Sequence, residues 1–182
     1  MKSLLISLFF VISVAAFTQQ KPGSHDDCIQ QVPGDWGPNF GDSWHEHEAR
    51  YWSCRVGVSV TMVKAWQRAA NEMDMADDIQ LVSLKGEQLV IFVEMGGTAH
   101  CFDVKVLHST GNDWSLVWRL PSTVSDICTQ KCPSLTAALN GDVLTIKLPI
   151  ASPKEDPIFS CKKYTWRKEQ FRWNGKTFDA IN

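Results

Sequence analysis

The sequence has no apolar run long enough to cross a bilayer, no marked excess of one charge, and no complete catalytic motif. Residues 4–17 form the most apolar stretch, which is shorter than the ~20 residues that a membrane-spanning helix needs, and polar Gln19 and Gln20 follow it. The formal net charge is −2, which is too small to indicate a polyanionic partner. A retained membrane anchor and binding by bulk charge are therefore not expected.

A zinc-protease motif is also incomplete, although His45 and His47 alternate with two glutamates. That motif places its two histidines four residues apart on one helical face, and the fourth residue after His45 is Ala49. Acidic residues at this point are typical of the first turn of a helix, where the helix dipole favours them. A secreted metal-assisted hydrolase using the His45/His47 region is kept as an alternative function, with these histidines as its candidate metal ligands.

Other catalytic arrangements are equally incomplete. Residues 57–61, Gly-Val-Ser-Val-Thr, lack the final glycine of a nucleophile elbow. Cys128 and Cys132 have a spacing that suits half of a metal site, but no second matching pair of cysteine or histidine lies nearby. We therefore expect no cofactor and no catalytic residue, and an enzyme is the less favoured interpretation.

Residues 1–18 have the features of a secretory signal peptide. Lys2 gives a charged start, an apolar run follows, and small residues precede the expected cleavage near Ala16 or Thr18. We therefore predict a secreted or periplasmic protein that keeps no membrane anchor. One compact domain, or a domain with a small appendage, fits the length that remains.

The cysteines of the mature chain are predicted to form disulfide bonds, because an even number of them follows an export signal and the destination is oxidising. Cys28 and Cys54 are the favoured pair, since both lie in the N-terminal part. Cys101 and Cys161 would each pair with one of two linker cysteines, in an order that the sequence leaves open. The disulfide candidates are Cys28, Cys54, Cys101, Cys128, Cys132 and Cys161.

The N-terminal part of the mature chain divides into two segments. Residues 19–41 contain repeated Pro-Gly and Gly-Pro pairs and are predicted to be an irregular lead-in. Residues 42–76 are predicted to form a helical hairpin. Its first helix should start near Trp44, because Ser43 and Glu46 have the spacing of a capping box.

The turn of this hairpin is expected at Gly57, which suits a left-handed backbone, and Ser59, which suits an N-cap. Alternating apolar residues over 56–62 leave a strand there as an alternative. The start Glu-Ala-Arg-Tyr-Trp at 48–52, this turn, and Trp66 together resemble short bacterial helix-turn-helix modules. The resemblance implies DNA binding by this segment.

Nucleic-acid binding by residues 42–72 is therefore a third hypothesis, and it requires that the chain is not exported. The region offers few cations for phosphate groups. These are Arg50, Arg55, Lys64 and Arg68. No nucleic-acid partner is expected.

Residues 77–182 are predicted to be β-rich, because short apolar runs alternate with glycine and asparagine turns. The expected strands of a first repeat, 79–120, are 79–84, 88–94, 100–107 and 114–120. Those of a second repeat, 134–179, are 135–139, 143–148, 161–167 and 170–173, followed by an Asn174-Gly175 turn toward Phe178.

The two repeats resemble each other, which predicts an internal duplication. The pattern Leu-x-Gly-x-x-Leu-x-Ile occurs at 84–91 and again at 139–146. Further on, Val106 matches Trp166 and Trp118 matches Trp173 after small length changes. Two repeats of ~50 residues are too few to close a propeller ring.

The predicted fold is therefore mainly β with a helical N-terminal part, an α+β arrangement. Two four-stranded antiparallel repeats would form a small sandwich or open barrel, stapled by disulfides.

The eight tryptophans should mostly be core. Four of them lie on late strands of the two repeats with arginine neighbours, and aromatic side chains offer large contact area at little entropic cost. Some would then line a groove for a sugar chain or a protein loop. The candidate ligand-binding residues are Trp114, Trp118, Trp166, Trp173, Arg167 and Arg172.

The favoured function is an exported, non-enzymatic binding module that recognises a protein or an envelope glycan, for example as an inhibitor or an immunity factor. This hypothesis depends largely on the missing catalytic constellation.

Overall fold

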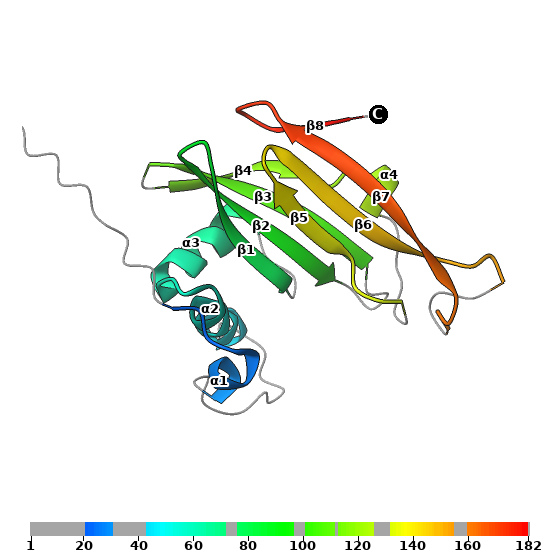
Figure 1. The fold of residues 1–182 in the computed structure, drawn as a ribbon. Helices are drawn as coiled ribbons and strands as arrows, with labels where there is room; N and C mark the ends of the chain where they lie inside the picture. The colour runs from blue at the N-terminus through cyan, green and yellow to red at the C-terminus, as the bar shows by residue number, and fades with distance from the viewer. Residues whose placement is uncertain are drawn as a thin grey trace, which may run out of the picture.

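A computed structural model describes residues 21–30, 43–71, 76–96, 101–111, 113–125, 132–154 and 160–181 (Figure 1). The predicted signal peptide and Cys128 lie outside the described residues. The helices in these ranges are α1 (His25–Gln30), α2 (Ser43–Val56), α3 (Val60–Ala69) and α4 (Ser122–Ser125). The strands are β1 (Ala76–Leu84), β2 (Glu87–Gly96), β3 (Cys101–Thr110), β4 (Asp113–Arg119), β5 (Thr136–Asn140), β6 (Val143–Ala151), β7 (Tyr164–Trp173) and β8 (Phe178–Ala180).

Part of the segment predicted to be an irregular lead-in is helical, because it contains α1. Ser24 lies just before this helix, and its Oγ accepts a hydrogen bond from the backbone N–H of Asp27 at 3.2 Å. The same hydroxyl donates to the Asp27 carboxylate at 2.5 Å. The Pro-Gly pair at 22–23 thus precedes a serine N-cap, and the prediction of irregular backbone over 25–30 was wrong.

α2 and α3 form a helical hairpin, so the alternative of a strand over 56–62 is wrong. Gly57 follows α2 with a φ of 75°, a left-handed conformation that glycine adopts at little cost. Ser59 then caps α3 by accepting a hydrogen bond from the backbone N–H of Met62 at 3.2 Å. The apolar residues of 56–62 therefore belong to the end of α2, the turn and the start of α3, and not to a pleated strand.

The strands form two four-stranded antiparallel sheets, each with its strands in chain order. Sheet A contains β1 to β4, and sheet B contains β5 to β8. The prediction of a mainly β protein with two four-stranded sheets is confirmed, and the facing sheets are consistent with an open sandwich.

The last hairpin differs from its prediction. Residues 161–167 and 170–173 were expected to be separate strands, but β7 continues through 168–169, where neither Lys nor Glu provides a turn. The chain reverses at Asn174-Gly175, as predicted, where Asn174 N–H donates to the carbonyl of Thr177 at 3.0 Å. The fourth strand of sheet B is therefore β8.

One hydrophobic core lies between the two sheets. Sheet A contributes Leu89, Ile91 and Val93 from β2, all of them fully buried. Sheet B contributes Leu144 and Ile146, which are 0% exposed, from β6. These alternate residues point to one face of each strand, as the period of a pleated strand requires.

A second core lies on the opposite face of sheet A. Val90, Phe92 and Leu107 pack there against residues of α2 and α3, including Trp66. The rings of Trp66 and Phe92 meet edge to face with centroids 6.3 Å apart. Sheet A therefore lies between the helices and sheet B, as Figure 1 shows.

The repeat pattern matches core-facing residues of β2 and β6, but the two halves differ in register. Its glycines occupy different turn positions: Gly86 is the second residue of the β1–β2 turn, whereas Gly141 is the first of the β5–β6 turn. The later matches also fail. Val106 pairs with Ile91, while Trp166 pairs with Pro149, on the opposite face of its strand.

Trp118 and Trp173, the other matched pair, lie on non-equivalent strands. Trp118 is on the fourth strand of sheet A, and Trp173 is on the third strand of sheet B. The shared topology and the apolar pattern follow from packing alone, and a common origin of the two halves stays a prediction.

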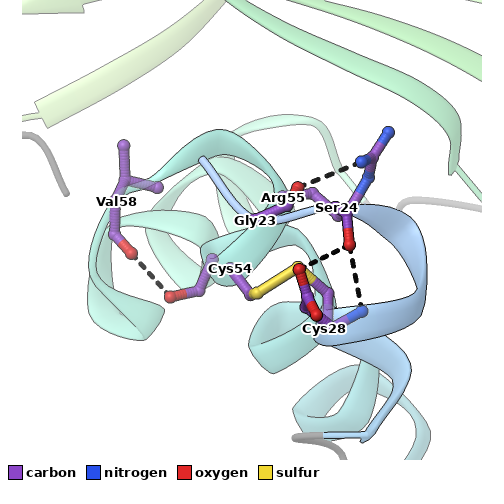
Figure 2. The surroundings of a disulfide bond; sticks show 8 residues. Gly23, Ser24, Cys28, Cys54, Arg55 and Val58 are labelled. Carbon is purple, nitrogen blue, oxygen red and sulfur yellow. Dashed lines mark hydrogen bonds between the residues drawn. A yellow bond between two sulfur atoms is a disulfide. The ribbon is translucent and has the colours of Figure 1, made fainter. Parts of the chain in front are cut away.

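Two disulfide bonds join described cysteines. Cys28–Cys54 links α1 to α2, as predicted, with Cα atoms 5.6 Å apart (Figure 2). Cys132–Cys161 links the segments that precede β5 and β7, which identifies the linker partner of Cys161. Cys101 is disulfide-bonded as well.

No helix in the described ranges has the length and apolar character of a membrane span.

Candidate functional site

Two of the four candidate tryptophans belong to the core between the sheets. Trp118 is 8% exposed and packs against Phe171 with ring centroids 4.8 Å apart. Trp173 is 5% exposed and packs against Phe178 at 5.1 Å. Because both side chains are covered, neither offers a contact surface to a partner.

Trp114 is half-buried at the second core, where its ring meets Trp66 edge to face at 5.6 Å. It also lines a cavity of about 210 Å³ between the start of α3 and the β3–β4 hairpin, together with Ser59 and Ser109. Pockets for small ligands usually exceed ~300 Å³. Its volume therefore does not favour Trp114 as a contact for a sugar chain or a protein loop.

Trp166 is the fourth candidate, and it is exposed. Its exposed fraction is 46%, and that of Tyr164 is 40%. Their rings meet edge to face with centroids 5.5 Å apart. The other exposed large apolar side chains of the described residues are Ile29 and Leu116, which lie on α1 and β4. Tyr164 and Trp166 are therefore the pair that forms a continuous exposed aromatic surface.

The backbone under these rings is a two-stranded ribbon. The last β5–β6 pair is Thr136 with Lys147, whereas β6 and β7 stay paired as far as Ala151 and Tyr164. Figure 1 shows β6 and β7 running together past the end of β5. The strand geometry fixes where the exposed rings point, because side chains alternate between the two faces.

One face of this ribbon carries both exposed rings. Phe171 and Trp173 of β7 face the core, so the even-numbered residues of this strand face away from it. Across the ribbon, Pro149 pairs with Trp166, and Lys147 pairs with Lys168. The term outer ribbon face is used below for the surface of Tyr164, Trp166, Lys168 and Lys147; Pro149 lies on the same side of β6 but is buried.

The outer ribbon face is positively charged. Lys147 and Lys168 are exposed, and neither strand places an acidic side chain on this face. Arg172 continues the same face toward β8, with its Nε 4.0 Å from Oδ1 of Asp142. The surface thus combines aromatic rings with cations at their margin.

The two candidate arginines lie on opposite faces. Arg172 shares the face of Trp166, because both have even numbers in one continuous strand. Arg167 lies on the other face, where its Nε donates to Oε1 of Glu169 at 2.5 Å. Of the six candidate ligand-binding residues, Trp166 and Arg172 share the face of β7 that points away from the core, six residues apart along the strand.

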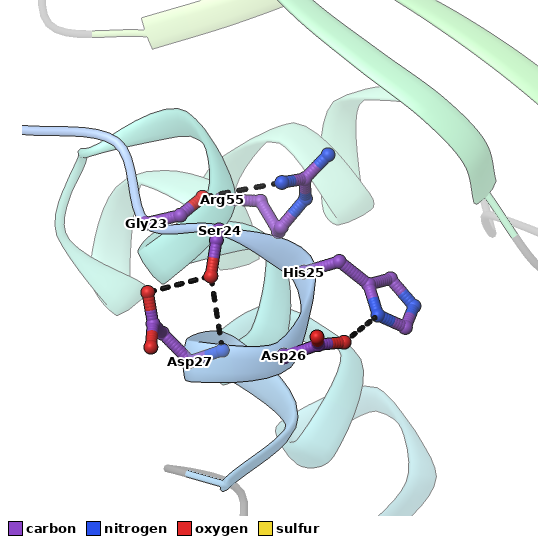
Figure 3. Close-up of polar contacts among 6 residues, drawn as sticks. All are labelled: Gly23, Ser24, His25, Asp26, Asp27 and Arg55. Atoms are coloured by element: carbon purple, nitrogen blue, oxygen red, sulfur yellow. Dashed lines mark hydrogen bonds and ion pairs between the residues drawn. The ribbon is translucent and has the colours of Figure 1, made fainter.

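The candidate metal ligands lie in the first turns of α2. His45 is exposed and His47 is half-buried, and side chains two residues apart on a helix diverge. His25, near the start of α1, lies 3.2 Å from Asp26 in an exposed pair (Figure 3). In the parts of the chain that are described, no three side chains of His, Cys, Asp or Glu come together as a metal site would require.

The cations of the helix-turn-helix-like segment are largely engaged within the protein. Glu46 forms ion pairs with Lys64 of α3 and with Arg50 of α2. Arg55 donates from Nη1 to the carbonyl of Gly23 at 3.1 Å (Figures 2 and 3). Val63, on the apolar face of α3, is buried in the second core. This packing explains the hairpin without a nucleic-acid partner.

The sequence contained a signal for the outer ribbon face that strand prediction missed. Tyr164, Trp166, Lys168 and Arg172 all have even numbers, so one unbroken strand places them on one face. Because the prediction split this strand at 168–169, it did not place these four residues on one face.

Comparisons of the chain with protein-family models, with curated proteins and with solved structures found no match.

Proposed function

We propose that this protein is an exported, non-enzymatic binding module that recognises a protein or a glycan through the outer ribbon face. The observation that carries the proposal is the exposed pair Tyr164 and Trp166 on a two-stranded ribbon. Export is supported by the features of residues 1–18 and by the disulfide bonds, which persist in oxidising compartments.

The physical argument concerns the cost of exposure. Two adjoining aromatic rings left in water give up the free energy that burial would contribute, and contiguous exposed apolar patches are typical of interaction sites. Tyrosine and tryptophan also lose little side-chain entropy when a partner covers them. The flanking Lys147, Lys168 and Arg172 would favour partners that carry negative charge.

Affinity isolation from the envelope and culture fluid of the native host tests this proposal. The disulfide-bonded wild-type chain is compared with a Tyr164→Ser/Trp166→Ser variant. The matched control is Leu116→Ser, which removes an exposed apolar side chain from β4. A partner retained by the wild type and the control but lost by the double variant supports the proposal. Equal retention by the double variant contradicts it.

A further inference from the structure

The backbone of β7 presents hydrogen-bonding groups along one edge of the ribbon. Trp173 N–H donates to the carbonyl of Asp142 at 2.8 Å, and Ser152 N–H donates to that of Lys163 at 2.9 Å. Hydrogen-bonded pairs alternate along an antiparallel ladder. The odd-numbered residues of β7 therefore bond to β6, and the even-numbered residues direct their N–H and C=O groups away from it.

The hydrogen bonds between β7 and β8 also involve even-numbered residues of β7, and they cover only the last part of that strand. Ile181 N–H donates to the carbonyl of Gln170 at 3.0 Å, which is an even-numbered position. The β7–β8 strand pairs run from Phe171 to Trp173. In the described part of the chain, β6 is the one strand that pairs with β7 over 164–169, so Tyr164, Trp166 and Lys168 form an open edge on the side away from β6.

The opposite edge of the ribbon is closed by a proline. Pro149 pairs with Trp166 at a position where the β6 backbone points away from β7. Proline has no N–H to donate, and edge prolines protect a strand from pairing with another chain. The two edges therefore differ, and β7 presents the one that can accept a strand.

We propose that an extended acidic peptide segment adds to this open edge as a further strand of sheet B. The proposal rests on the proposed function and names the partner class. Backbone groups of Tyr164, Trp166 and Lys168 would pair with the peptide, and their side chains would contact its residues on the outer ribbon face.

Charge selects the acidic peptide over a second copy of this chain. The segment 163–172 contains Lys163, Arg167, Lys168 and Arg172 against one acid, Glu169, which is bound to Arg167. A second copy would bring these same cations against the edge, whereas a peptide with glutamate or aspartate would complement them. A glycan would not use the strand spacing of the backbone groups.

The first test uses the full disulfide-bonded chain and a capped synthetic peptide of alternating glutamate and valine. Binding is measured by calorimetry, and hydrogen exchange of the backbone amides by NMR. The expected result is slower exchange at Trp166 and Lys168 in the complex. The same peptide N-methylated at alternate residues should bind about ten- to a hundredfold more weakly, because it loses backbone hydrogen bonds.

A pair of variants tests the backbone directly. Lys168→Pro removes both the outward N–H and the charge, whereas Lys168→Gln removes only the charge. The proline variant should lose more peptide affinity than the glutamine variant, by about tenfold. If Lys168→Pro does not fold, the binding of the N-methylated peptide to the wild-type chain still tests whether backbone hydrogen bonds form at this edge.

Several outcomes would overturn the inference while leaving the proposed function intact. These are equal binding of the N-methylated peptide, no binding of the acidic peptide, and amide protection that appears only as the protein dimerises. Binding of sulfated dextran in place of the peptide, without amide protection, would do the same. Failure of the proposed function is seen separately, when the partner isolated from the host is unaffected by the Tyr164→Ser/Trp166→Ser change.

Discussion

The indole N–H of Trp173, on β7, donates a hydrogen bond to Oε2 of Glu87, on β2, at 3.3 Å. The same carboxylate oxygen lies 3.6 Å from Nε2 of His108, whose ring lies 5.7 Å from the indole of Trp173. These contacts connect sheet B to sheet A at the edge of their shared core. Trp173 therefore has a partner for its polar atom inside the protein.

Replacing Trp173 by phenylalanine should lower the free energy of unfolding by about 1–3 kcal/mol, through the lost hydrogen bond and the lost ring volume. Glu87→Gln should cost less, because the amide oxygen still accepts. A double-mutant cycle with Glu87→Ala, measured by chemical denaturation, should give a coupling energy of about 0.5–1.5 kcal/mol. Additive effects would show that this hydrogen bond does not stabilise the sandwich.

Truncation of Trp118 should cost much more stability than truncation of Trp166. Trp118→Ala removes a buried ring from the core between the sheets and should cost about 3–5 kcal/mol of stability. Trp166→Ala removes a half-exposed ring and should cost less than about 1 kcal/mol. Thermal or denaturant unfolding of both variants measures the difference. A large loss for Trp166→Ala would mean that its ring is structural.

Gly23→Ala should disturb the packing of α1 on α2. A Cβ atom at this position would lie 2.6 Å from the sulfur atoms of both Cys28 and Cys54, which is closer than real contacts allow. We expect a loss of about 1–3 kcal/mol and slower oxidation of this pair. Pro22→Ala, at an exposed neighbouring residue, is the control. Thiol alkylation during refolding gives the rate, and equal rates for both variants would contradict the prediction.

The ion pairs of Glu46 should make the hairpin sensitive to acid. Lys64 and then Arg50 hold the pKa of Glu46 below its ordinary value of 4.5, because their charges and hydrogen bonds favour the carboxylate. A lowered folded-state pKa contributes stability that is present above the unfolded-state pKa and is lost as the pH falls through the folded-state value. Glu46→Gln should therefore be less stable than the wild type near neutral pH.

The same comparison in acid is the critical one. The stabilities of Glu46→Gln and the wild type should converge as the pH falls well below 4.5. The unfolding midpoints of both proteins, measured across this range, provide the check. A constant gap would show that the glutamine acts through packing rather than through lost charge.

Local sequence signals predicted the elements more successfully than their partners. The turn at Gly57, the N-cap at Ser59 and the apolar run of β2 are each set by neighbouring residues, and each is found in the structure. β7 was predicted as two strands with a break at 168–169, whereas its end at Trp173 and the turn at Asn174-Gly175 are found as predicted.

Exposure of the tryptophans could not be predicted in the same way. Trp118 and Trp166 each precede an arginine in a strand, and only the pairing of strands decides which ring is covered. Phe171 and Phe178 cover Trp118, whereas Trp166 lies on the ribbon that extends past β5. The open edge likewise depends on which residues of β7 pair with β8, and this pairing is between strands rather than within one.

The central position of β2 has a consequence for cooperativity. Its residues Leu89 to Val93 are buried on both faces, alternately in the core with sheet B and in the core with the helices. Neither core can loosen without exposing side chains of this strand, so melting of the helical hairpin and separation of the sheets should occur in one transition. The amides of β2 would then exchange only through global unfolding.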